Sequence, residues 1–276
     1  MTLFPKIGAS AGTGQRPGGF ARWCDLLSRY FKHLFVTNLL TIAGFLPFTV
    51  GVVYAILSSS ILVLIPACII GGAIAGPALA CMYDAVYRSL REAPGKCMAN
   101  YRKALKQNWR HAIIPGIIFC LFIGFYIFML MMFWWASKGP GFGTIAVCIF
   151  SIIVFTMFFS IYWPQYVLFD QPQLQRCRNC LLFMIRYFLK TLGCSVLQVV
   201  YWGIMALFLP WTLLLVPLIG FWFILFLSNF LIYDTMNDVF EIEDKIAQAF
   251  PDQAVIYEDD EAWLKRKQEE DHETHR

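Results

Sequence analysis

The chain has 276 residues, of which 59% are hydrophobic, 17% aromatic and only 14% charged, and its mean hydropathy is +0.60. A soluble domain of this length would be about a quarter charged, so the composition excludes an ordinary soluble globular protein. Uninterrupted apolar runs of about 20 residues recur along the sequence and predict an all-α, polytopic helical membrane protein.

The formal net charge of +4 conceals two regions of opposite sign. Residues 1–233 contain 17 Lys/Arg and 4 Asp/Glu, whereas residues 234–276 contain 5 Lys/Arg and 14 Asp/Glu. The first region therefore carries about +13 and the second about −9. We predict a basic cytosolic arm (1–33), a transmembrane helical domain (34–233) and an acidic cytosolic tail (234–276).

The arm ends in a stretch in which aromatic residues alternate with Arg22, Arg29 and Lys32. This pattern favours an amphipathic helix lying at the headgroup level. No cleavable signal peptide is expected before it, so the first apolar run would itself direct insertion. The uncharged stretch 34–82 is too long for one crossing, and the serines at 58–60 divide it into predicted spans at 34–58 and 61–82.

The second span contains small residues at intervals of four, namely Gly72, Gly76 and Ala80. Such a ridge lets two membrane helices approach closely. We expect it to serve packing within the chain first and association of two copies second.

A basic segment at 83–111 separates the second span from the third. Its cations are Arg88, Arg91, Lys96, Arg102, Lys103, Lys106 and Arg110. From Met98 to Ala112 the apolar residues fall on one helical arc and four of the cations on the adjacent arc. This pattern predicts an interfacial helix on the anionic lipids of the inner leaflet, where each cation contributes about 1 kcal/mol. Simple topological anchoring is the more ordinary interpretation, and nucleic acid is not an expected partner.

Four further spans complete the predicted domain. They lie at 112–135, 144–168, 191–209 and 211–233. Pro210 divides the last uncharged stretch, as the serines divide the first. Because both stretches need tight turns, four crossings with re-entrant hairpins is the alternative.

Six crossings place 16 Lys/Arg of the arm and the two basic loops on one side and only Lys138 on the other. The positive-inside rule then predicts that both termini face the cytoplasm.

No sequence motif predicts catalysis, a cofactor or a metal. The sequence lacks a glycine-rich phosphate loop, a His-Glu-x-x-His motif and a Gly-x-Ser-x-Gly motif. Cys177 and Cys180 form one CxxC pair among arginines, which would lower their pKa values, but a zinc site needs two more ligands. The nine cysteines lie in apolar runs or predicted cytosolic segments, so we expect no disulfides and no enzyme.

Two stretches, GPALACMYDAVYRSLR from Gly76 and KALKQNWRHAIIPGII from Lys103, resemble the YesL family of small bacterial integral membrane proteins, whose function is undetermined. FLPFTVG around Pro47 and the block from Phe169 to Leu192 are similar to the same family. The apolar insert at 52–75 departs from the family pattern, which affects the first two spans. The resemblance implies a bacterial plasma membrane and an accessory role near sugar-uptake systems, and it implies no catalytic residues.

The sequence therefore favours an accessory or scaffold protein that packs against a membrane transporter, such as an ABC-type carbohydrate importer. The alternative is a transporter or permeation pathway in its own right, as a homo-oligomer. A polar groove lined by Asn38, Thr41, Gln198 and Asn229 would favour the alternative, and a dry interior would favour the accessory role. The predicted spans contain no Asp, Glu, Lys, Arg or His, which argues against ion-coupled transport.

Overall fold

The structure is a computed structural model that describes residues 19–93, 96–136 and 139–249. These residues form helices and no strand. The helices are α1 (Gly19–Leu57), α2 (Ile61–Leu90), α3 (Cys97–Trp135), α4 (Phe142–Leu168), α5 (Gln173–Arg186), α6 (Phe188–Leu207), the 3-10 helix η2 (Trp211–Leu214), α7 (Val216–Ile219), α8 (Phe221–Phe240) and α9 (Ile242–Ala249). Most of the predicted arm and of the acidic tail lies outside the described residues.

Six helical segments are long and apolar enough to cross a membrane. They are α1, α2, α3, α4, α6 and the segment Val216–Phe240, which contains α7 and α8. The predicted all-α polytopic architecture with six transmembrane helices is thereby confirmed.

Several helix ends differ from the predicted spans. α2 continues past residue 82 to Leu90, and α3 begins at Cys97, so the expected loop at 83–111 is only the short connection between these helices. The amphipathic stretch and the third span form one helix. A long helix is favoured here because every backbone polar group is then bonded within the helix.

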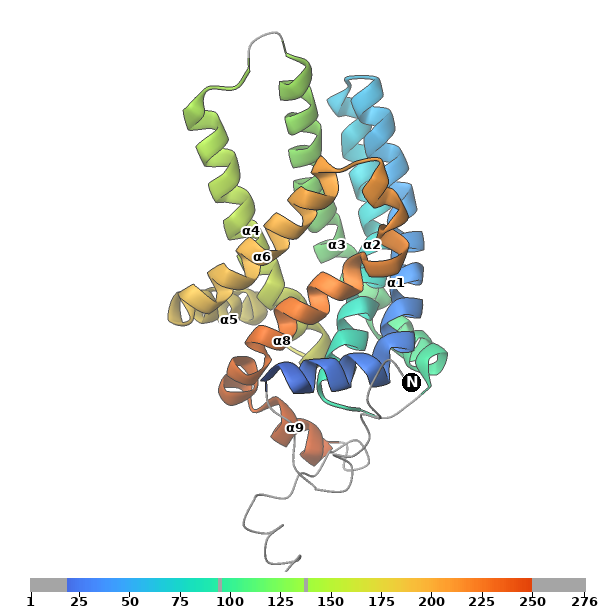
Figure 1. The fold of residues 1–276 in the computed structure, drawn as a ribbon, viewed down its shortest axis with the longest axis vertical. Helices are drawn as coiled ribbons and strands as arrows, with labels where there is room; N and C mark the ends of the chain where they lie inside the picture. The colour runs from blue at the N-terminus through green and yellow to red at the C-terminus, as the bar shows by residue number, and fades with distance from the viewer. Residues whose placement is uncertain (1–18, 94–95, 137–138, 250–276) are drawn as a thin grey trace, which may run out of the picture.

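The connections gather at two ends of the molecule (Figure 1). The start of α1, the α2–α3 connection and the end of α8 lie at one end, which we call the basic end. The α1–α2 turn, the end of α3 and the start of α4 lie at the opposite end. The first part of α1, in dark blue, runs across the long axis, as a helix lying on a membrane surface would, and the rest runs along it.

α2 is the most enclosed of the long helices, because α1 and α3 pack along it. Gly72 and Gly76 make the approach to α3 close: a Cβ atom on Gly76 would lie 2.7 Å from the Cα atom of Gly116, and one on Gly72 2.7 Å from the Cα atom of Ile117. Ala80 is fully buried. The structure therefore puts the small-residue ridge at a helix–helix contact within the chain.

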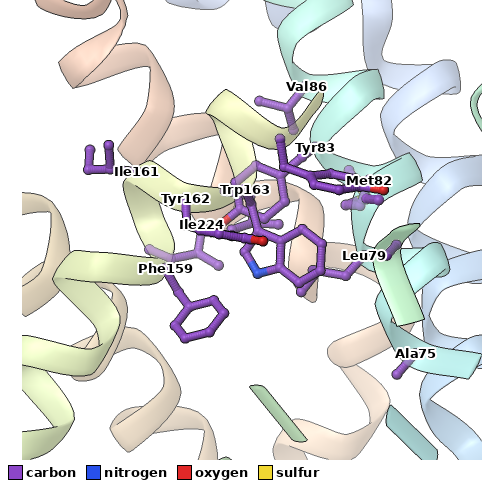
Figure 2. Packing of buried hydrophobic residues seen from close by; sticks show 14 of the residues in the cluster. Ala75, Leu79, Met82, Tyr83, Val86, Phe159, Ile161, Tyr162, Trp163 and Ile224 are labelled. Carbon is purple, nitrogen blue, oxygen red and sulfur yellow. The ribbon is translucent and has the colours of Figure 1, made fainter. Parts of the chain in front are cut away.

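The aromatic part of the core joins α2 to α4. Trp163 is fully buried and stacks on Tyr83, with ring centres 6.2 Å apart. Figure 2 shows Leu79 and Met82 of α2 and Ile224 of α8 around the same indole. This contact holds α4 against the α1–α2–α3 unit near the basic end.

The predicted sixth span is broken. η2, α7 and α8 follow one another, and Gly220 lies at the α7–α8 junction. Figure 1 shows α6 and α8 slanting, and their connection reaches less far toward the opposite end than the α1–α2 turn does. Despite the break, the segment Val216–Phe240 is long and apolar enough to cross a membrane.

Candidate membrane-surface site

Exposed cations lie on the first turns of α3 and just before it. They are Lys96, Arg102, Lys103, Lys106 and Arg110, and we call them the basic face. Ala104 and Ala112 are buried on the other side of the same helix. Within the described ranges, no carboxylate forms an ion pair with any of these cations. The basic face therefore presents uncompensated positive charge.

Apolar side chains lie beside these cations. Trp109 is 50% exposed and Met98 is 46% exposed. The Arg110 guanidinium carbon lies 5.9 Å from the centre of the Trp109 ring. Tryptophan is enriched where membranes meet water, because its ring is apolar and its N–H is polar. The chemistry of this helix therefore matches a headgroup layer.

Arg88 and Arg91 do not belong to the basic face, although the sequence groups them with it. Arg88 lies in the last turns of α2, where its Nε atom is 2.7 Å from Asp84 Oδ2 and both side chains are 11% exposed. Arg91 is half-buried, and its Nε atom donates to the Tyr87 carbonyl oxygen at 3.3 Å. Because α2 continues to Leu90, Arg88 lies on the helix and Arg91 directly follows it, and both side chains pack on the protein.

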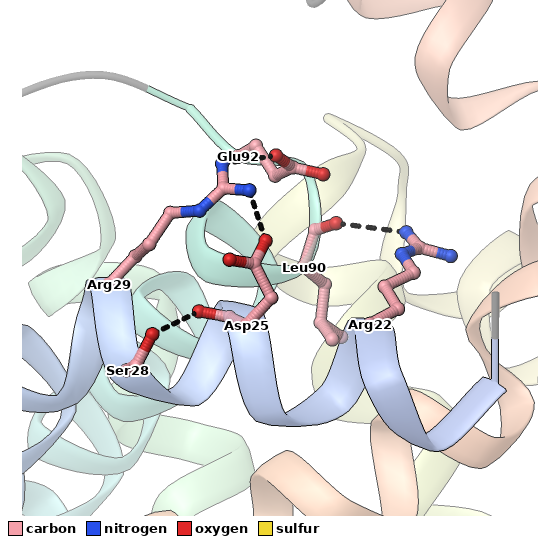
Figure 3. Close-up of polar contacts among 6 residues, drawn as sticks. All are labelled: Arg22, Asp25, Ser28, Arg29, Leu90 and Glu92. Atoms are coloured by element: carbon pink, nitrogen blue, oxygen red, sulfur yellow. Dashed lines mark hydrogen bonds and ion pairs between the residues drawn. The ribbon is translucent and has the colours of Figure 1, made fainter. Parts of the chain in front are cut away.

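A second group of polar contacts connects α1 to the end of α2 (Figure 3), and one further ion pair connects α1 to α8. Arg29 pairs with the buried Asp25 one turn earlier and with Glu92 at 2.9 Å. Arg22 donates to the Leu90 carbonyl oxygen at 3.3 Å and pairs with Asp234 at 3.2 Å. These contacts hold the transverse part of α1 against the basic end of the bundle.

The four polar residues of the permeation alternative do not line the groove between α3 and α4 that is described below. All four are buried. The Thr41 hydroxyl donates to the Thr37 carbonyl oxygen at 2.8 Å, and the Gln198 amide donates to Ser228 Oγ at 3.0 Å. The side-chain Oδ1 atom of Asn229 accepts from the Tyr87 hydroxyl at 3.0 Å. These groups serve helix–helix packing.

Asn38 has a distinct role at the α7–α8 break. Its Nδ2 atom donates to the carbonyl oxygens of Val216 at 3.2 Å and Pro217 at 2.9 Å. Its Oδ1 atom accepts from the backbone N–H groups of Phe221 at 2.8 Å and Trp222 at 3.4 Å. One amide from α1 thus satisfies backbone groups on both sides of the break, as a membrane interior demands.

A side chain of α6 also donates hydrogen bonds to backbone carbonyl groups at the break. The Tyr201 hydroxyl donates to the carbonyl oxygens of Ile219 at 2.6 Å and Gly220 at 3.1 Å. The Trp222 indole N–H donates to the Leu218 carbonyl oxygen at 2.6 Å. Each carbonyl group from Val216 to Gly220 therefore lies within hydrogen-bond distance of a donor in the protein, and those of Ile219 and Gly220 share the one proton of the Tyr201 hydroxyl.

The CxxC pair has no metal-site character. No group of three potential ligands is found among the residues that the structure describes. Burial raises the pKa of the Cys180 thiol well above its usual range, which reverses the lowering expected from the neighbouring arginines. The buried thiol is protonated at neutral pH and is a poor nucleophile.

The Asp84–Arg88 pair and the Asn38 contacts were missed by sequence reasoning. The i,i+4 spacing of Asp84 and Arg88 is a local signal that could have indicated the first. The second depends on residues about 180 positions apart in the chain and leaves no local pattern.

Comparison with protein-family models, with curated proteins and with solved structures finds no match to this chain.

Proposed function

We propose that this integral membrane protein is a non-enzymatic accessory or scaffold protein whose basic end rests on anionic lipids of the inner leaflet. The observation that carries the proposal is the basic face, which presents five cations without an ion pair to any described residue, beside exposed apolar side chains. Cations near an anionic membrane surface contribute about 1 kcal/mol each, so the set would bind a lipid surface strongly.

The proposal includes an orientation. The basic end would face the cytoplasm, with both termini on that side, because positively charged loops are retained there. The resemblance to the YesL family implies that the protein would lie in a bacterial plasma membrane and act beside a carbohydrate importer. Its partner would then be a transporter subunit that packs against the exposed apolar faces of the spans.

The interior supports the accessory role over the alternative of a transporter or homo-oligomeric pore. Asn38, Thr41, Gln198 and Asn229 are buried and hydrogen-bonded to protein groups. The break in the sixth span has its carbonyl groups satisfied by side chains. A transport site built on broken helices would instead direct such groups at its substrate.

Lipid recruitment by the basic face can be measured on the full chain extracted in native lipid discs. We expect the variant R102Q/K103Q/K106Q to retain several-fold less anionic lipid than the unaltered chain. The matched control R102K/K103R/K106R keeps every charge and should retain the same amount. Equal retention by all three proteins would contradict the proposed site.

The accessory role requires a different experiment. In-cell crosslinking followed by purification in native lipid and mass spectrometry should recover subunits of a transport system. Recovery of only this chain, in crosslinked oligomers, would contradict the accessory role and favour the homo-oligomeric pore.

A further inference from the structure

The helices α3 and α4 are in contact over only part of their length. Near the middle of the spans they pack through stacked rings, and the centres of the Phe122 and Phe155 rings are 3.6 Å apart. The last polar contact between them is a hydrogen bond between the hydroxyls of Tyr126 and Ser151. Beyond it the two helices diverge toward the opposite end (Figure 1), and a groove of about 480 Å³ lies between them.

The groove has walls that suit a hydrocarbon. On α3 they include Phe125 and Met129, and on α4 they include Gly143, Val147 and Cys148. Thr144, near the start of α4, adds one hydroxyl to walls that are otherwise apolar.

The inner end of the groove is formed by the Tyr126–Ser151 pair. The Tyr126 hydroxyl can donate to Ser151, whose hydroxyl donates in turn to the Val147 carbonyl oxygen at 2.7 Å. A polar ligand would therefore gain little there, whereas an apolar one would leave no polar group newly unpaired.

The groove lies within one leaflet. Its α4 wall runs from Gly143 to Ser151 and rises about 12 Å at 1.5 Å per residue, and its α3 wall runs from Phe125 to Met129 and rises about 6 Å. Half of the hydrocarbon thickness is about 15 Å. Beyond the groove, toward the facing ends of the two helices, Trp134 is 84% exposed and Phe142 is 88% exposed. Exposed aromatic rings at a span end mark the membrane–water interface.

The groove is too small to enclose a whole helix. A helix about 10 Å in diameter would fill roughly 1,000 Å³ over a similar depth, whereas the groove holds about 480 Å³. A helix of a second copy could lie against the open side of the groove but would not fit inside it, whereas a single acyl chain is narrow enough to enter.

We propose that the groove between α3 and α4 binds one acyl chain of a phospholipid from the leaflet at the opposite end. The headgroup would lie at the level of the exposed Trp134 and Phe142 rings, and the chain would extend to the Tyr126–Ser151 pair. The site is independent of the basic face and of the orientation of the protein.

The test uses the full chain in vesicles of phosphatidylethanolamine and phosphatidylglycerol. The probe is a phosphatidylcholine with a photoreactive diazirine in the middle of one acyl chain. Peptide-resolved mass spectrometry should find the crosslinks concentrated on Met129, Val147 and Cys148, and the yield there should saturate as the probe fraction rises. Crosslinks spread evenly over lipid-facing positions of other helices, such as Val200 and Leu231, with no saturation, would overturn the proposal.

A groove-filling variant adds a second readout. Gly143 lines the groove, and a Cβ atom there would meet no other atom within 4 Å, so G143F should fill the space without strain. We expect it to reduce crosslinking in the groove at least fivefold. G193F, on the exposed side of α6 where a Cβ atom is equally unhindered, is the matched control and should change nothing. Undiminished labelling in G143F, or chain-to-chain crosslinks in place of lipid adducts, would contradict the site.

Discussion

At the scale of single residues, the Asp84–Arg88 pair shows how an ionic group can be tolerated so near an apolar bundle. Each side chain is 11% exposed, and the two charges are one helical turn apart on α2. A buried ion pair contributes little net stability, but removal of one partner leaves the other charge buried and unpaired. A substitution that removes one member of the pair should therefore lower the stability of the protein.

The substitution D84N tests that argument. It keeps the shape of the side chain and removes its charge, so Arg88 remains buried without a counter-ion. We expect the free energy of unfolding to fall by about 3–5 kcal/mol. The measurement is unfolding in mixed micelles, followed by circular dichroism.

Glu241 provides the control, because its pair with Lys245 has side chains that are 66% and 54% exposed. E241Q should change the free energy of unfolding by less than about 1 kcal/mol. Similar values for D84N and E241Q would show that Arg88 finds water or another partner.

Asn38 is the second residue on which much depends, since its side chain bonds to four backbone groups at the α7–α8 break. N38L keeps the branching and the number of side-chain heavy atoms but leaves these groups without the amide, and each buried unsatisfied group costs about 1–3 kcal/mol. The expected loss in the same unfolding assay is at least about 2 kcal/mol.

T41V is the matched variant, one turn further along α1 and equally buried. It removes a hydroxyl whose acceptors are carbonyl oxygens of helix interiors, those of Thr37 and Ala78. Its loss should be near 0.6 kcal/mol, the average for such bonds between membrane helices. A loss for N38L no larger than that for T41V would mean that the break does not depend on α1.

At the scale of elements, the α2–α3 contact rests on two glycines facing each other. A methyl group on Gly76 would lie 2.7 Å from the Cα atom of Gly116, which is backbone and cannot rotate away. G76A should therefore force the two helices apart and reduce the free energy of unfolding by about 1–3 kcal/mol.

A glycine-to-alanine substitution in open surroundings should change the free energy of unfolding in the opposite direction. Gly193 lies in α6, and a Cβ atom there meets nothing within 4 Å. Alanine favours helix over glycine by about 0.8–1 kcal/mol, so G193A should stabilise slightly. If G76A and G193A lowered the free energy of unfolding equally, neither close packing at Gly76 nor helix propensity at Gly193 would explain the result.

The elements also show what local sequence can predict. The apolar spans were predictable because bilayer thickness sets the length of an uncharged helix. The longer α2 was missed because charged residues were expected to end the span, although the i,i+4 spacing of Asp84 and Arg88 lets the two charges enter the helix as a pair. The break at Gly220 was not predictable from local sequence, since its partners Asn38 and Tyr201 lie on other helices. The basic face was recognisable from helical periodicity, whereas the burial of Arg88 and Arg91 was not.

At the scale of the whole molecule, the two ends differ in charge. The basic face and the α1 ion pairs lie at one end, while the turn at Ser58–Ser60 and the start of α4 carry no charged side chain among the described residues. Translocation of a cluster of lysines and arginines is disfavoured, so an asymmetry of this size predicts the threading of the chain.

Labelling of single engineered cysteines in intact cells can test this orientation. G141C lies just before α4 at the opposite end, and K103C lies within the basic face. We expect a membrane-impermeant maleimide to label G141C from outside, above the background of the unaltered chain. K103C should gain label only after the cells are permeabilised, because the basic end would be cytoplasmic. The reverse pattern would place the basic face on the outer surface, away from the anionic inner leaflet, and would remove the premise of the proposed lipid contact. The acyl-chain groove would remain possible in that case, because its depth and apolar walls are the same in either orientation.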